Sequence, residues 1–258
     1  MSRKNAFLIH MALSTLVLGA VFALVLFVWY PRPYFRIVDA WYLIRILFFV
    51  AFVAGPLLTL IVFKPGKWGL KFDLWFIAIV QVSSLAYGAV TLYQQRPYFM
   101  VFSVDRFELI PAKNLDMSQL QYESLKEKPW IGTVPVFAQL PEDPEEASRF
   151  MDEVFFDGKR DLEGRPEYWH PYADHALDVA SKARDIEQLL GEGEKIADLA
   201  MQVIERHQGS HQQLGFVPLI GRTSSFSMVL DMQTGEQLQI LEIDPYKLSI
   251  DKQAQTDP

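Results

Sequence analysis

Three apolar stretches near the start of the chain are each long enough to cross a membrane as a helix. They cover residues 6–30, 41–63 and 72–93. About 20 residues of helix span the bilayer core. None of the stretches has the polar face that a helix of this length carries in a soluble protein. The sequence therefore predicts three transmembrane helices.

The charges divide the chain at the same place. Residues 1–93 hold eight Lys/Arg and two acids, a net of +6, whereas residues 94–258 hold 16 Lys/Arg and 29 acids, a net of −13. This acidic part argues against nucleic acid as a partner, because nucleic-acid binding needs a basic surface. The absence of cysteine excludes disulfides and thiolate metal sites. We expect a transmembrane region over residues 1–93, an α+β domain over residues 94–248 and a disordered tail over residues 249–258.

The flanking charges decide the expected orientation. The first apolar stretch is longer than the roughly 7–15 residues of a signal-peptide core, so we interpret it as an uncleaved span. Basic residues flank the spans equally on the two sides, but the free amino terminus and three lysines within residues 64–71 favour a cytoplasmic N-terminus. We expect a multi-pass membrane protein with its C-terminal domain on the outer side of the membrane.

Small and polar residues interrupt the second and third stretches. Pro56 removes a backbone hydrogen bond, so a freed carbonyl group of that helix needs another partner. Polar side chains of the third stretch, such as Gln81, are costly when they face lipid, and we expect them to face the second helix or a helix of another protein. The candidate residues for helix packing or for contact with a partner helix are Gly55, Pro56, Gln81, Ser84 and Gly88.

The loop between the second and third stretches has the composition of a tight turn. Lys64, Pro65, Gly66 and Lys67 combine two turn-forming residues with two lysines suited to the headgroup region. We interpret them as a cytoplasmic turn. A phosphate-binding P-loop is excluded because its glycine and lysine spacing is absent.

The run from Gly55 to Leu74 carries a family resemblance. Its sequence GPLLTLIVFKPGKWGLKFDL resembles the type IV pilin accessory proteins of the TfpX/TfpZ family, and Trp29-Tyr30-Pro31, Gln81, Ala86-Tyr87-Gly88 and Arg96-Pro97 support the match. The resemblance covers about the first 110 residues closely. It implies a protein of the bacterial inner membrane, with its C-terminal domain in the periplasm, that works with a major type IV pilin. The candidate helix-packing residues of the second and third stretches are then also candidate pilin-contact residues. It brings no catalytic residues and no cofactor.

The acidic region has the pattern of a globular domain. Asp143 followed by proline and two glutamates is typical of a helix start, and an apolar stripe predicts a helix over residues 194–207. Other expected helices cover residues 143–156 and 173–190. Expected strands cover residues 98–104, 106–110, 130–140, 216–220, 226–231 and 237–243, the last two forming a hairpin.

Nothing in this domain has the spacing of a catalytic or metal site. His170 and His175 lie five residues apart and His207 and His211 four apart, without a third ligand at a telling spacing. Ser224, Ser225 and Ser227 lie in a strand-like run rather than in a nucleophile turn. We therefore expect no enzyme activity, no metal and no cofactor.

These observations leave three functional hypotheses. The first is a non-enzymatic accessory factor for type IV pili, with the major pilin, inner-membrane pilus assembly proteins and the lipid bilayer as partners. The alternative is a membrane-anchored periplasmic sensor or ligand-binding protein. A membrane-anchored enzyme is the third, and it requires a convergent polar site in the acidic domain.

Overall fold

The computed structural model describes residues 2–127, 129, 131–207 and 213–248. The chain divides into two compact units, Met1–Arg96 and Pro97–Pro258, which we call unit 1 and unit 2. The predictions that concern Trp130, His211 and the tail from residue 249 lie outside the described residues.

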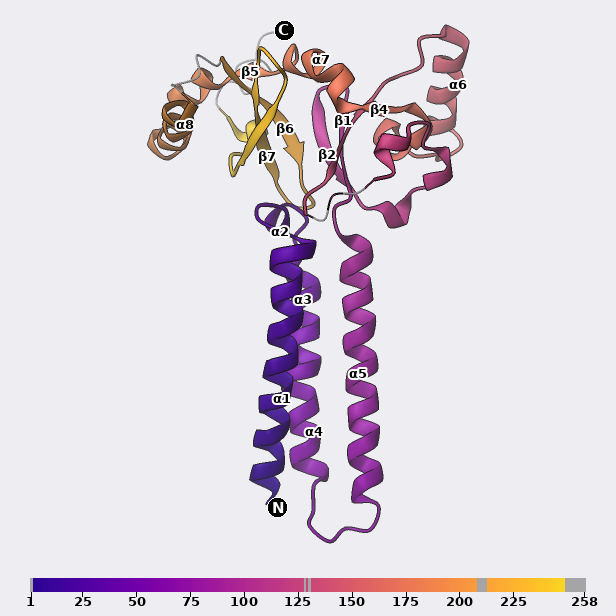
Figure 1. The fold of residues 1–258 in the computed structure, drawn as a ribbon, viewed down its shortest axis with the longest axis vertical. Helices are drawn as coiled ribbons and strands as arrows, with labels where there is room; N and C mark the ends of the chain where they lie inside the picture. Colours follow the sequence, from indigo (N-terminus) through magenta and orange to yellow (C-terminus); the bar gives the residue numbers. More distant parts are fainter. Residues whose placement is uncertain (1, 128, 130, 208–212, 249–258) are drawn as a thin grey trace. The chain divides into compact units, whose positions relative to one another are not determined.

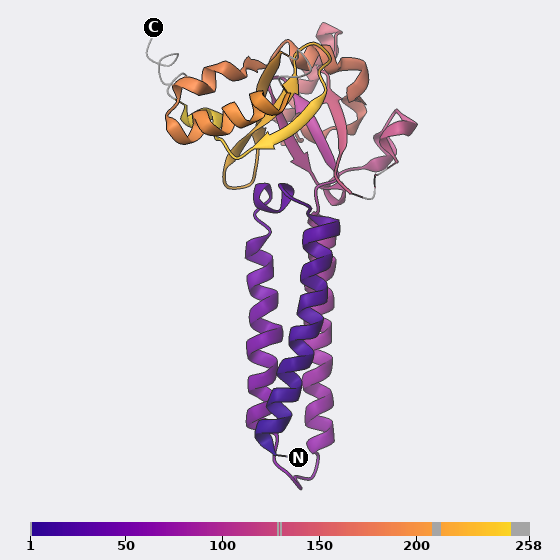
Figure 2. The same cartoon turned by 60° about the vertical axis from the view of Figure 1, so that its left-hand side comes forward.

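Unit 1 consists of three long helical segments that lie side by side (Figures 1 and 2). The first is α1 (Arg3–Leu24) with a π-helical extension, Val25–Trp29; the second is α3 (Trp41–Phe48), a π-helical segment Phe49–Ala54 and α4 (Gly55–Val62); the third is α5 (Leu70–Gln95). The short helix α2 (Tyr34–Ile37) joins the first two. The stretches Arg3–Trp29, Ile44–Val62 and Leu70–Gln95 are long and apolar enough to cross a membrane, by length and composition.

The outer surface of unit 1 is largely apolar. Leu16, Phe27 and Trp75 are each at least 70% exposed, and many other large apolar side chains of the three segments are exposed as well. Exposed apolar surface of this extent is unfavourable in water and typical of a surface that contacts lipid or another protein. The prediction of three long apolar helices is confirmed, with boundaries within a few residues of those expected.

Unit 2 is built on one mixed sheet. Its strands are β1 (Phe99–Ser103), β2 (Arg106–Ile110), β3 (Val134–Ala138), β4 (Trp169–Pro171), β5 (Arg184–Asp185), β6 (Leu214–Ile220), β7 (Ser225–Asp231) and β8 (Gln237–Leu241). The strand order is β4-β3-β1-β2-β6-β7-β8, and β5 pairs with β6. The β1–β3 and β2–β6 pairs are parallel and the other pairs are antiparallel.

Two helices cover different halves of this sheet (Figure 1). Helix α6 (Pro144–Phe155) places Phe150 in a core with Phe99 of β1 and Trp169 of β4. Helix α8 (Glu194–His207) places Ala200 and Val203 in a second core against β6, β7 and β8. Every residue of β1 is buried, so apolar groups cover the sheet on both faces there.

Several predictions for unit 2 are confirmed. The β1–β2 pair, the β7–β8 hairpin and the stripe on α8 form as expected. Asp143 caps α6 by accepting hydrogen bonds from the backbone N–H groups of Glu145 and Glu146. These signals were local in sequence, and each involves a few consecutive residues.

The prediction of one helix over residues 173–190 is wrong. The structure has a helical turn over 172–175, the short α7 (Ala176–Ala180), strand β5 and a 3₁₀ helix, Ile186–Gly191. Long-range contacts override the local pattern, because Arg184 and Asp185 pair with Phe216 and Gly215 of β6. The Asp185 side chain also accepts a hydrogen bond from the backbone of Glu187, which starts a new turn.

Candidate functional site

A polar network joins the three helical segments of unit 1. The Nδ1 atom of His10 in α1 lies 2.6 Å from Oγ1 of Thr59 in α4, and its Nε2 atom lies 2.6 Å from Oε1 of Gln81 in α5. The Gln81 Nε2 atom donates to Oγ of Ser14 at 3.0 Å and to the backbone carbonyl of Ala51 at 2.8 Å. A hydrogen-bonded group of this kind holds helices together where no water is available.

The orientation of the Gln81 amide fixes the protonation pattern of this network. A carbonyl oxygen only accepts hydrogen bonds, so the amide nitrogen must face Ala51 and the amide oxygen must face His10. The Nε2 atom of His10 therefore carries a hydrogen and donates it to Gln81. In the neutral imidazole, Nδ1 then accepts the hydroxyl hydrogen of Thr59.

Pro56 explains why Ala51 needs this contact. The preceding segment is π-helical, and the N–H of Gly55 donates to the carbonyl of Val50, five residues back. The next residue in that register, Pro56, has no N–H to offer the carbonyl of Ala51. Gln81 supplies the missing donor from α5. The freed carbonyl expected from the sequence is thus identified as Ala51, and its partner as Gln81.

Two glycines allow close helix approach in unit 1. A Cβ atom at Gly55 would overlap the Gln81 side chain, and a Cβ atom at Gly88 would overlap the side chain of Leu47 in α3. A larger residue at either position would force the facing side chain to move, so the two glycines allow these helices to pack with Gln81 and Leu47 in their present positions. Gly55, Pro56 and Gln81 thus lie at one contact of α4 with α5, and Gly88 lies at a separate contact of α5 with Leu47 of α3.

The remaining polar residues of α5 behave differently from the expectation. Ser84 donates to the carbonyl of Val80 and Thr91 to that of Tyr87, so each is satisfied within its own helix. Ser83 is exposed. The sequence left two orientations open for these hydroxyls, toward the second helix or toward a helix of another protein. The exposed Ser83 does not face the second helix within unit 1, so for Ser83 the second orientation stays a prediction. Ser84 and Thr91 need neither contact, because a helix offers its own carbonyls to Ser and Thr.

A second contact closes the opposite end of the helices. Tyr30 is almost fully buried, and its hydroxyl donates to the carbonyl of Leu92 at 2.7 Å. The ring of Trp29 lies edge-on to Tyr93. The carbonyl of Leu92 would otherwise lack a partner near the end of α5, where no further helical turn follows.

The predicted turn at residues 64–67 lies between α4 and α5, at the same end of unit 1 as the chain start (Figures 1 and 2). Gly66 adopts a positive φ of 76°, which favours glycine. The Nζ atom of Lys67 lies 2.6 Å from Oδ2 of Asp73 in the first turn of α5. Lys64 is exposed and Lys67 is paired, so the two lysines differ in environment.

Sequence reasoning missed three members of the network, namely His10, Ser14 and Thr59. Each is a polar residue within an otherwise apolar stretch, and Ser14 and Thr59 are buried. The signal available in the sequence was the polar side chain within an apolar stretch. The pairing among them depends on the rotation of each helix, which the sequence pattern of a helix that is apolar all round does not specify.

In unit 2, two of the histidines considered as metal ligands come close together. The rings of His170 and His175 have centroids 5.3 Å apart, His170 Nδ1 contacts the Tyr122 hydroxyl at 2.9 Å and His175 Nδ1 contacts Oδ2 of Asp178 at 2.9 Å. Burial and the neighbouring His175 lower the pKa of His170. Within residues 2–127, 129, 131–207 and 213–248, no group of three or more His, Asp or Glu side chains is arranged to hold a metal.

The serines considered as nucleophiles lie at or in strand β7. The Ser227 hydroxyl is buried and donates to the carbonyl of Ile243 at 3.0 Å. Ser225 is the first residue of the strand and pairs with Ile220. Ser225 and Ser227 thus take part in strand pairing and in a hydrogen bond within the sheet domain.

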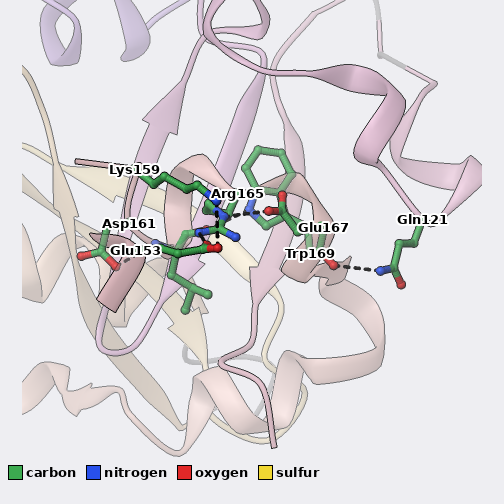
Figure 3. A network of polar contacts seen from close by, with 8 residues as sticks. Gln121, Glu153, Lys159, Asp161, Arg165, Glu167 and Trp169 are labelled. Atoms are coloured by element: carbon green, nitrogen blue, oxygen red, sulfur yellow. Dashed lines mark hydrogen bonds and ion pairs between the residues drawn. The ribbon is translucent and has the colours of Figure 1, made fainter. Parts of the chain in front are cut away.

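The most extensive ionic network of unit 2 centres on Arg165 (Figure 3). Its Nη1 and Nε atoms lie 2.8 Å from Glu153 and 2.7 Å from Glu167, and Glu153 also binds Lys159 at 2.8 Å. The hydrogen bonds from Lys159 and Arg165 lower the pKa of Glu153. Because the Arg165 guanidinium also lies over the ring of Phe150, this network ties α6 to the segment before β4.

The chain was compared with known protein families and proteins. The fimbrial assembly protein FimB model matches residues 1–39. The chain is 33% identical over 115 residues to the fimbrial assembly protein of serogroups C1 and C2 from Dichelobacter nodosus, which covers 43% of this chain and 87% of that relative. This chain belongs to the fimbrial assembly protein family. It is 26% and 25% identical to the fimbrial assembly proteins of serogroups I and E1 of Dichelobacter nodosus, in each case over 246 residues that cover 93% of this chain and 95% of the relative.

No solved structure matches this fimbrial assembly protein. The similarity to the serogroup I and E1 relatives extends over both unit 1 and unit 2, since 93% of the chain is covered. The family assignment therefore concerns the helical unit and the sheet unit together, and it establishes a role in fimbrial biogenesis.

Proposed function

We propose that this fimbrial assembly protein is a non-enzymatic accessory factor of type IV pili. It acts in the bacterial inner membrane and assists the assembly, stability or surface display of the major pilin. The observation that carries the proposal is the similarity over 93% of the chain to proteins named for fimbrial assembly. The resemblance of residues 55–74 to the TfpX/TfpZ accessory proteins supports the finer assignment to pilin.

The surface of α5 offers a place for the pilin. Five exposed apolar residues recur at helical spacing on one side of α5: Phe76, Ile79, Val80, Tyr87 and Val90. The exposed Ser83 lies in the middle of this stripe. A hydroxyl that faces lipid is less favourable than one that faces a neighbouring helix. We place an apolar helix of the pilin along this stripe.

The function is tested by a clean in-frame deletion in the source organism, with sheared surface pili and total pilin measured on the same cultures. Loss of surface pili with normal pilin supports a role in assembly or display. Loss of both supports a role in stabilising the subunit. Complementation with the intact gene restores both quantities. Unchanged pili and pilin contradict the proposal and favour the sensor alternative.

The proposed orientation has its own test, which uses the absence of cysteine from the chain. Single cysteines replace the exposed Lys64 in the turn and the exposed Lys113 in unit 2. A membrane-impermeant maleimide on intact spheroplasts is expected to label Lys113→Cys at once and Lys64→Cys only after lysis. The reverse labelling pattern would contradict a cytoplasmic N-terminus and a periplasmic unit 2.

A further inference from the structure

A groove with a volume of about 500 Å³ lies between α1 and the second helical segment of unit 1. Its walls are apolar except for Thr15 and Arg45. On α1 it extends from Thr15 past Gly19 to Val25, and on the other side from Trp41 to Phe52. None of the residues that line it belongs to the His10 and Gln81 network, so the groove is a separate feature of the same unit.

The length of the groove matches one leaflet of a bilayer. The helix rises about 15 Å over the ten steps from Thr15 to Val25, at about 1.5 Å per step. The hydrocarbon core is about 30 Å thick, so the groove extends through about half of it. An acyl chain fits this depth. A transmembrane helix of a partner would instead run through both leaflets and would need a groove about twice as long.

The two ends of the groove differ in polarity. On the second helical segment the wall begins at Trp41, continues one turn later at Arg45 and ends at Phe52. The Nε atom of Arg45 lies 3.4 Å from the carbonyl of Trp41, which directs the guanidinium back toward the start of the second helical segment. The second helical segment begins with two exposed aromatic residues, Trp41 and Tyr42. Exposed Trp and Tyr side chains are enriched at the membrane interface, so a guanidinium directed toward them reaches headgroup depth.

Arg45 has no carboxylate partner among the described residues. Unit 1 contains two acids, Asp39 and Asp73, and Asp73 is bound to Lys67 at the opposite end of the helices. Arg45 forms no ion pair with Asp39, and its one hydrogen bond in the described chain is the contact with Trp41. A guanidinium beside an apolar groove at the interface lacks an anion, and a phosphate group matches its geometry.

We propose that this groove binds an anionic phospholipid, with its phosphate at Arg45 and one acyl chain against Gly19. The proposal rests on the membrane location in the proposed function. Basic side chains next to apolar surfaces between transmembrane helices are suited to anionic lipid headgroups. The bound lipid fills the space between α1 and α3 where the described side chains leave a gap, and it supplies the counter-ion that Arg45 lacks.

Gly19 provides the decisive variant. A Cβ atom built at Gly19 meets no atom within 4 Å, so a side chain at this position starts in open space, and Gly19→Leu is expected to occupy the groove. The neighbouring Ala20 is exposed and does not line the groove, which makes Ala20→Leu a matched control of similar added volume on the same helix. Arg45→Gln removes the charge and leaves the groove.

The experiment is native mass spectrometry of the full-length protein released from nanodiscs with equal phosphatidylglycerol and phosphatidylethanolamine. The intact protein is expected to retain phosphatidylglycerol about fivefold over phosphatidylethanolamine, the preference that one arginine at an anionic surface provides. Arg45→Gln is expected to reduce this ratio to about one, again because one such charge is lost. Gly19→Leu is expected to retain neither lipid, and Ala20→Leu to behave as the intact protein does.

Equal retention of both lipids by the intact protein would overturn the proposal, as would undiminished phosphatidylglycerol on Gly19→Leu. An unchanged unfolding midpoint shows that Gly19→Leu is folded. Because lipid retention is measured on purified protein, it is independent of any effect of the deletion on pili. Release of the protein from membranes by carbonate would instead show that the membrane location itself is wrong.

Discussion

The side-chain amide of Gln81 donates a hydrogen bond to the backbone carbonyl of Ala51, the group that Pro56 leaves without its π-helical donor. One side chain of α5 thereby compensates for a proline in the neighbouring segment and also holds His10 of α1. Gln81 therefore links all three helical segments of unit 1 through its side-chain hydrogen bonds.

Gln81→Leu is expected to destabilise unit 1 by about 2 kcal/mol, because it leaves the Ala51 carbonyl and His10 without partners. Unfolding of the full-length protein in mixed micelles with increasing SDS measures the change. Ser84→Ala is the matched control on the same helix, and its effect should stay within about 0.5 kcal/mol because the Ser84 hydroxyl bonds only its own helix. Equal losses in both variants would show that Gln81 has no special role.

Gly88→Leu is expected to destabilise unit 1 by about 2 kcal/mol, since the added side chain overlaps Leu47. Leu47→Ala, which makes room for it, should be less harmful in the Gly88→Leu background than alone. A double-mutant cycle in the same SDS titration is predicted to give a coupling of at least about 1 kcal/mol. Strict additivity of the two changes would contradict the contact.

Arg165→Met is expected to destabilise unit 2 by about 2–3 kcal/mol, because Arg165 is mostly buried and hydrogen-bonded to two carboxylates. Arg165→Lys should lose less, since lysine keeps the charge but cannot contact both Glu153 and Glu167 in the same geometry. Urea unfolding of the full chain in detergent, followed by tryptophan fluorescence, checks the ranking. A lysine variant as unstable as the methionine variant would contradict it.

Tyr172 is expected to make the stability of unit 2 decrease at high pH. Burial raises its pKa to about 12, and its hydroxyl donates to the carbonyl of Gly235 at 2.6 Å. The unfolded chain loses this proton near pH 10, so the folded state binds more protons between pH 10 and 12 and becomes less stable as pH rises. Tyr172→Phe should cost about 1–2 kcal/mol at pH 8, and its deficit relative to the intact protein should shrink between pH 10 and 12. A constant deficit over this range of urea titrations would show that Tyr172 does not titrate in the predicted window.

Local signals were enough for much of the fold. The long apolar stretches predicted the long helices of unit 1, and Asp143 with the following proline predicted the start of α6 correctly. The segment over residues 173–190 was mistaken for a helix because its strand, β5, consists of two residues paired with distant β6. A two-residue strand has no periodicity of its own to detect.

The polar network was only partly predictable. The sequence showed that Pro56 leaves a backbone carbonyl without its donor and that Gln81 needs a polar partner. It did not show that Gln81 bonds to this carbonyl, which belongs to Ala51. The contact of His10 with α4 and α5 could not be predicted, because the sequence of a helix that is apolar all round does not show which face packs against its neighbours. The partners of a buried polar group follow from helix rotation, which is set by close contacts such as Gly88 with Leu47.

The most direct test of the account is crosslinking of pilin to α5 in living cells. A photoreactive phenylalanine analogue replaces Tyr87, which is 77% exposed on the apolar stripe of α5, and separately Trp68, which is 98% exposed in the turn before α5. The account predicts a pilin adduct from position 87 and none from position 68. Absence of any adduct from position 87, with the protein at its normal level, would contradict direct contact with pilin.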